Sequence, residues 1–120
     1  MELKIELYMK ITKVSEAPVK ETPHKVDTRP VYDTESAQAV HVRLEPGERL
    51  KPHITPVDVF FYILEGTPNV HIGDEQETVQ ADWVIESPKD IVHYLSNTSE
   101  KPARILVVKA PRPTRQTKLL

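Results

Sequence analysis

Hydrophobic and polar residues alternate in short runs along most of this 120-residue chain. In residues 39–44, Val40, Val42 and Leu44 fall on one face of a strand, because successive side chains point to opposite sides. Residues 59–64 are apolar at every position, which is typical of a strand buried on both faces. No window with helical periodicity reaches helix length with caps. The pattern therefore predicts an all-β protein.

Turn residues divide the rest of the chain into further short strands. Residues 68–72 and 75–79 flank Gly73 and Asp74, which predicts a hairpin with Gly at the first turn position. Strands are also predicted at residues 1–8, 82–86, 92–96 and 104–109. Residues 15–34 hold three prolines among charged residues and predict a loop or an edge strand. Many short strands with short connections favour a sandwich or barrel.

Composition and charge exclude several classes of function. A formal net charge of −2, no helix-turn-helix pattern and a basic cluster confined to residues 109–118 argue against a nucleic-acid partner. No apolar run approaches the length of a membrane span, and the first eight residues alternate unlike a signal peptide, so we expect a cytoplasmic protein without a membrane partner. The absence of cysteine excludes disulfides, thiolate chemistry and Cys-based zinc sites.

The segment from Gly47 to Gly66 is the most informative part of the chain. It fits the spacing G-x5-H-x-H-x3-E-x6-G, with His53 in place, Thr55 where the second His is expected, and Val59 where the Glu is expected. This segment resembles the first signature of the cupin family. Two of the three glycines are landmarks of this signature, which is what a backbone requirement for glycine would produce.

A second segment resembles the other cupin signature, G-x5-P-x-G-x2-H-x3-N. Pro88, His93 and Asn97 occupy their expected places, whereas Asp82 and Asp90 stand where Gly is usual. The resemblance covers residues 44–108 and implies a cupin-type double-stranded β-helix, a jelly-roll barrel with little or no helix.

The resemblance also implies a site inside the barrel, where cupins bind a divalent metal through the two His and the Glu of the first signature and the His of the second. His53 and His93 remain as metal ligands, whereas Thr55 is a poor ligand and Val59 cannot be one. Because catalytic metal sites generally use three protein ligands, we favour a metal-free pocket over a two-histidine metal site. Without a metal, two imidazoles can bind anions or act as an acid/base pair.

Phe61 shares its face with the lost Glu position, so the wall of the predicted pocket is apolar. Two alternatives add residues to it: His41 or His71 as a further metal ligand, and His41 with Arg43 reaching inward to bind a carboxylate or phosphate. Asn97 is interpreted as a turn-stabilising residue, and His24 has no assigned role. The predicted ligand-binding residues are His53, Thr55, Val59, Phe61 and His93.

The chain divides into three parts: a strand and Pro-rich arm at residues 1–36, the barrel at 37–110, and a basic, extended and solvated tail at 111–120. Phe60, Tyr62 and Leu64 form an apolar outer face. This face predicts contact with a second subunit, hence a homodimer, or cover by the arm, which packs on the barrel or on a partner.

Three functions remain open. The first is a cupin that binds a small molecule of unknown identity and is not an enzyme. The second is a metal-dependent enzyme, such as a dioxygenase, isomerase or decarboxylase of small acids or sugars, with a reduced ligand set. The third is a dimeric scaffold whose pocket is vestigial. We favour the first, because both replaced positions of the first signature face the metal.

Overall fold

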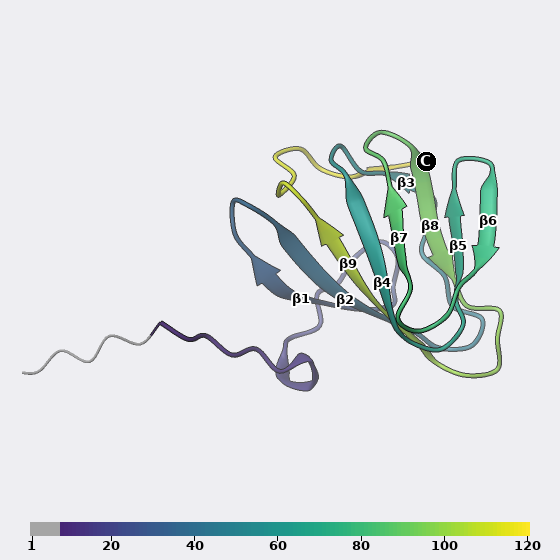
Figure 1. The fold of residues 1–120 in the computed structure, drawn as a ribbon, viewed down its shortest axis with the longest axis horizontal. Helices are drawn as coiled ribbons and strands as arrows, with labels where there is room; N and C mark the ends of the chain where they lie inside the picture. The colour runs from purple at the N-terminus through teal and green to yellow at the C-terminus, as the bar shows by residue number, and fades with distance from the viewer. Residues whose placement is uncertain (1–7) are drawn as a thin grey trace, which may run out of the picture.

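In the computed structural model, which describes residues 8–120, the chain forms two five-stranded antiparallel sheets around one core (Figure 1). The predicted jelly-roll barrel is confirmed, and the helical content is one 3-10 turn, η1 (Val14–Glu16). Most of the predicted strand at residues 1–8 lies outside the described residues. The strands are β1 (Asp27–Asp33), β2 (Gln38–Leu44), β3 (His53–Ile54), β4 (Val59–Glu65), β5 (Asn69–Ile72), β6 (Glu75–Thr78), β7 (Val84–Ser87), β8 (Val92–Ser96), β9 (Ala103–Lys109) and β10 (Lys118–Leu119).

The strand order is β1-β2-β9-β4-β7 in one sheet and β10-β3-β8-β5-β6 in the other. The predicted burial of β4 on both faces holds for one face only: Val59, Phe61 and Ile63 are buried, whereas Phe60 and Leu64 on the outer face are each 36% exposed. The hairpin between β5 and β6 also forms, with Gly73 at a φ of +57°. Among residues 8–120, no helix is long and apolar enough to cross a membrane.

Two segments pair with the sheets in ways that local sequence patterns do not show. Within the predicted loop or edge strand, β1 is an edge strand paired with β2. The tail is not wholly solvated, because β10 pairs with β3 and the tail crosses the upper end of the barrel in Figure 1. Both β3 and β10 have two residues, too few for a periodicity to identify them.

Strands β4 and β8 end at the lower end of the barrel in Figure 1, where the chain packs tightly at Gly66. A side chain at Gly66 would place its Cβ 2.5 Å from the carbonyl oxygen of Pro102. Asn97 is 1% exposed and donates hydrogen bonds to the carbonyl oxygens of Leu44 and Lys101, which confirms its predicted role in stabilising a turn. The core residues with no exposed surface are Leu44, Ile63, Leu95, Ala103 and Ile105.

Asp82 and Asp90 show how the second signature works without its glycines. Both adopt the left-handed backbone conformation, with φ of +70° and +64° respectively. Asp tolerates this region better than most residues that carry a Cβ, since its short polar side chain can bond locally. The Asp residues therefore preserve the turn geometry of the positions where Gly is usual.

Candidate functional site

The upper end of the barrel in Figure 1 carries a layer of residues aligned by strand register. In the first sheet, Lys109 pairs with Gln38 on one side and with Val59 on the other, and Val59 pairs with Ser87. Paired positions in a sheet direct their side chains to the same face. Since Val59 belongs to the core, the register directs Lys109 toward the barrel interior as well.

The second sheet contributes two histidines to the same end. His53 on β3 pairs with His93 on β8, and their ring centroids lie 4.6 Å apart in an edge-to-face arrangement. His93 forms hydrogen bonds through both ring nitrogens, Nδ1 to Ser87 Oγ at 2.6 Å and Nε2 to Thr55 Oγ1 at 3.1 Å. His53 Nδ1 donates to the carbonyl oxygen of Lys51 at 2.7 Å, which leaves Nε2 as an acceptor in the neutral ring.

The structure brings the five predicted ligand-binding residues together. Phe61 packs edge-to-face on His93, with 5.4 Å between ring centroids, and Thr55 bonds to the same imidazole. Val59 and Phe61 are 4% and 2% exposed, so the apolar wall forms where the strand pattern predicts it. Their contact with a ligand stays a prediction.

His24 belongs to this cluster, although the sequence pattern assigns it no role. Its Nδ1 accepts a hydrogen bond from the Lys51 backbone N–H, and its ring lies 5.0 Å from that of His53. No periodic pattern marks His24, because it sits in a Pro-rich loop that only tertiary packing positions. His24 is therefore a third imidazole at this end of the barrel, beside His53 and His93.

Lys109 is the residue that the sequence analysis missed. Burial lowers its pKa, and the charge of Lys20 lowers it further. The charge of Lys109 in turn lowers the pKa of His24, His53 and His93. The sequence did contain a signal for Lys109. In a strand that buries Ile105 and Val107, position 109 lies on the same inner face.

Burial keeps the imidazoles of the cluster neutral at physiological pH. Desolvation, followed by the charges of His53 and Lys109, lowers the pKa of His93 to about 3. Desolvation and the charges of His53, Lys51 and Lys109 lower the pKa of His24 to about 4. Burial also lowers the pKa of His53. The site therefore combines neutral rings with the amine of Lys109.

The donor set at this end does not fit a divalent metal. His93 has both ring nitrogens engaged by hydroxyl groups, and the basic side chain of Lys109 acts on both imidazoles. Within residues 8–120, no three His, Cys, Asp or Glu side chains are grouped so that they could hold a metal ion. Binding of a metal by His53 and His93 stays a prediction, which direct metal analysis can test.

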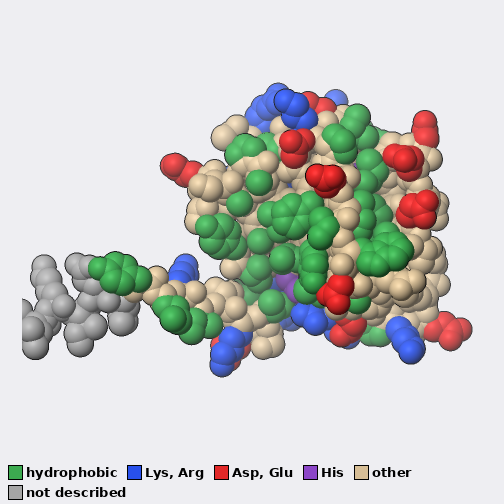
Figure 2. Space-filling view, viewed as in Figure 1, with side chains coloured by type: hydrophobic (Ala, Val, Ile, Leu, Met, Phe, Trp, Pro, Cys, Tyr) green, Lys and Arg blue, Asp and Glu red, His purple; other side chains and the backbone are tan. Residues whose placement is uncertain are grey.

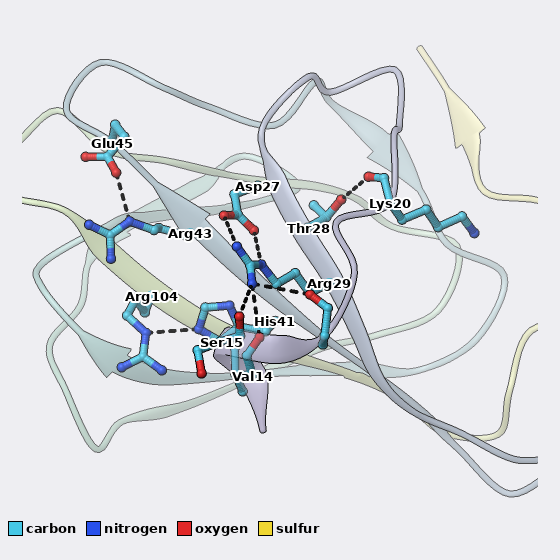
Figure 3. A network of polar contacts seen from close by, with 11 residues as sticks. Val14, Ser15, Lys20, Asp27, Thr28, Arg29, His41, Arg43, Glu45 and Arg104 are labelled. Carbon is cyan, nitrogen blue, oxygen red and sulfur yellow. Dashed lines mark hydrogen bonds and ion pairs between the residues drawn. The ribbon is translucent and has the colours of Figure 1, made fainter. Parts of the chain in front are cut away.

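His41 and Arg43 do not reach into the barrel, contrary to one alternative from the sequence. Val42, between them, belongs to the core, so both lie on the outer face of β2, where Arg104 Nε donates to His41 Nε2 at 3.0 Å (Figure 3). His41 is only 3% exposed because the arm covers it: Arg29 donates to the backbone oxygens of residues 14, 15 and 17 above the ring (Figure 3).

His71 is also unavailable as a ligand inside the barrel. Its neighbours on β5, Val70 and Ile72, pack in or against the core, so His71 faces outward. There Nε2 bonds to Ser96 Oγ at 2.9 Å, and the ring stacks on Tyr94 at 4.0 Å. Neither candidate for a further metal ligand therefore approaches His53 and His93.

Comparison with known proteins identifies the family. The family model of the cupin domain matches residues 40–109. The chain belongs to the cupin family. As a cupin it has the jelly-roll frame that both signatures indicate. At the upper end of the barrel, called the polar end below, Thr55 and Val59 stand where the signature has metal ligands, and Thr55 and Ser87 bond to His93.

The protein TT1209 of Thermus thermophilus is 31% identical, with a TM-score of 0.75 over 88% of this chain and 100% of that one. The polyketide cyclase RemF of Streptomyces resistomycificus has the same fold, with a TM-score of 0.80 over 93% of this chain and 85% of that one, at 17% identity. A curated relative, the polyketide synthase CurC of Streptomyces cyaneus, is 32% identical over 75 residues. That match covers 59% of this chain, and the chain spans about half (49%) of that relative.

Proposed function

We propose that this cupin binds a small organic molecule at the polar end of its barrel, with His53, His93 and the wall of Val59 and Phe61 as the recognition surface. One observation carries the proposal: two neutral imidazoles meet edge-to-face beside an apolar wall, and His53 Nε2 has no hydrogen bond to the described residues. Polar groups that converge beside apolar side chains are typical of ligand sites. We propose that this occurs in the cytoplasm, without nucleic acid or membrane as partner.

The names of two relatives suggest where to look for the ligand. A polyketide synthase and a polyketide cyclase are among the similar proteins, and polyketides are rich in carbonyl and hydroxyl oxygens. The acceptor at His53 Nε2 suits a hydroxyl group, and the wall of Phe61 suits a ring. A screen should therefore include phenolic, carbonyl and carboxylic compounds beside common metabolites.

A thermal-shift screen tests the proposal. A ligand that binds the folded state raises the melting temperature, and stabilisation reaches about 2.7 kcal/mol at a hundredfold excess over its dissociation constant. We expect that His53→Ala or Phe61→Ala removes the shift, whereas the control His71→Ala, on the outer face, retains it. If no compound in a broad screen raises the melting temperature, or if the two substitutions leave the shift intact, the proposal is wrong.

The metal-dependent enzyme is tested on protein purified without an affinity tag. Metal content is measured as isolated and after Fe, Mn, Ni or Zn is offered. Less than about a tenth of an equivalent throughout would exclude a resident metal in this protein. About one equivalent, lost on His53→Ala or His93→Ala, would favour the enzyme over the binding protein.

The dimeric scaffold is a second candidate, favoured by apolar side chains on the outer face of the first sheet. Hydrophobic side chains gather on the face shown in Figure 2. On the outer face of the first sheet, the exposed fractions are 36% for Phe60 and 58% for Val84, and Trp83, which precedes β7, is 47% exposed. An apolar group of this kind on a barrel suits contact with a second copy. Light scattering should show a dimer that Phe60→Lys disrupts and that the control Ile91→Lys leaves intact; a monomeric parent would exclude this candidate.

A further inference from the structure

The side chain of Lys109 allows the class of ligand to be specified. We infer that the polar end of the barrel is an anion site in which Lys109 is the charged anchor, and that its ligands are small organic carboxylates with an apolar body. This inference rests on the proposed function and narrows it.

Basic groups supply the charges that act on Lys109 and its neighbours. The charges that lower the pKa of Lys109, and of the three imidazoles His24, His53 and His93, come from basic groups: Lys20, Lys51, Lys109 and His53. The four ion pairs within residues 8–120 are all made by arginine. Lys109 therefore forms no ion pair with a carboxylate among the described residues.

Asp58 is an acidic residue next to the register partner of Lys109, but its side chain bonds to another part of the chain. Asp58 precedes Val59, the register partner of Lys109, and its carbonyl oxygen accepts a hydrogen bond from the Ala110 N–H. However, the Asp58 side chain is exposed, and its Oδ1 accepts a hydrogen bond from the Lys89 N–H at 2.9 Å. Because Asp58 also flanks an inward position, the strand directs its side chain to the outer face. It does not compensate Lys109.

A partly buried lysine such as Lys109 is stabilised by a counterion. A buried ammonium group without a counterion is unfavourable, since it loses hydration without gaining a partner. An incoming carboxylate supplies the missing charge, and attraction between the two groups is stronger here than in water because the surroundings are of lower polarity. Such a ligand is therefore favoured over a neutral molecule of the same shape.

The surroundings of Lys109 favour a carboxylate with an apolar body over an inorganic anion. Lysine presents one compact charge, which matches a monoanion. The neighbours of Lys109 in the register are an amide, Gln38, and an apolar side chain, Val59, which belongs to the same core cluster as Phe61. This wall favours an apolar group next to the charge, and inorganic phosphate has none.

Benzoate and benzamide provide a matched pair of probes, since they share a ring and differ in charge. NMR titration of the His53 and His93 imidazole resonances at pH 7.5 measures both dissociation constants. We expect benzoate to bind at least about tenfold more tightly than benzamide. Lys109→Met should abolish this preference while benzamide binding remains, and Lys109→Arg should retain part of it. Lys109→Gln provides a second neutral variant if Lys109→Met does not fold.

The outcomes separate this inference from the proposed function. Equal affinity for the two probes, or a preference that survives in both neutral variants, overturns the inference and leaves a binding site for neutral compounds. Binding of inorganic phosphate in place of benzoate overturns the carboxylate class. If neither organic probe perturbs the imidazoles, the inference is wrong, and the broad thermal-shift screen decides the proposed function independently.

Discussion

The two ends of this barrel are built on opposite principles. At the lower end, Gly66 approaches the backbone at Pro102 so closely that no side chain fits, and the amide of Asn97 is fully used in a turn. At the upper end, imidazole, hydroxyl and amine groups converge, and His53 keeps a ring nitrogen without a hydrogen bond to the described residues. The lower end serves the fold, whereas the upper end is where we propose that a ligand binds.

This difference explains how positions of the two cupin signatures can be replaced while the fold is kept. The signature positions at the lower end fix backbone geometry, which Gly66 supplies as a glycine and Asp82 supplies by adopting a positive φ. The positions at the upper end face the barrel interior, where Thr55 and Val59 can replace metal ligands without disturbing any strand. Thr55 bonds to His93 instead, and Val59 joins the core. A change of chemistry is therefore compatible with an unchanged frame.

The largest effect is expected from Gly66→Ala. The new Cβ would lie 2.5 Å from a backbone oxygen, and the residue has a φ of +83°, so the free energy of unfolding should fall by about 3 kcal/mol or more. Gly47→Ala is the matched control: its φ is +87°, but nothing lies within 4 Å, so a loss of about 1 kcal/mol is expected. Equal losses in urea denaturation would show that the lower end is not tightly closed.

Acidification should weaken the upper end more than the lower one. The pKa of His93 is about 3 in the folded protein, against an ordinary value of 6.5, so the unfolded chain takes up the proton first as the pH falls. Stability from this group is complete above pH 6.5 and decreases between pH 6.5 and 3. At pH 5 the expected loss from His93 is about 2 kcal/mol relative to pH 7.5.

Urea denaturation at pH 7.5 and pH 5.0 measures this loss. His93→Gln should lose less stability than the parent between the two values, because its contribution no longer titrates. His71→Gln, on the outer face, should lose nearly as much as the parent. An unchanged pH dependence in His93→Gln would show that His93 does not control acid sensitivity.

The smallest effects are expected at the two Asp residues with positive φ, one at each end. Asp90 replaces a usual Gly near the upper end, so Asp90→Gly should raise the free energy of unfolding by less than about 1 kcal/mol through relief of strain. Asp82→Gly also relieves strain but loses the hydrogen bond from Tyr62 Oη, 2.6 Å from Oδ1, and should be neutral or destabilising. Stabilisation by both substitutions would contradict this difference.

Most of the fold could be predicted from the sequence because its strands follow simple alternation and its turns use Gly, Pro and Asp. The strand at Val92–Ser96 was predicted with its observed bounds. In contrast, β3 and β10 could not be found, since two residues carry no period and form a strand only when a distant segment pairs with them.

The site was predictable only in part, for the same physical reason. His53, Thr55, Phe61 and His93 follow from the signatures and the strand alternation, and the structure brings them into contact. His24 depends on a loop that folds over β3, which no local pattern reveals. His41 lies on the polar face of its strand, yet its burial depends on cover by the distant arm.

The edge strand β1 also bears on aggregation. An open sheet edge presents unpaired backbone groups and can recruit a strand from another chain, which leads to aggregation. Pro30 interrupts this edge because it has no N–H to donate, and the register shift between Pro30 and Tyr32 distorts it further. At the edge of the other sheet, Glu75 and Glu77 place negative charge on β6. These two edges thus oppose the fibrillar pairing to which an all-β protein is prone.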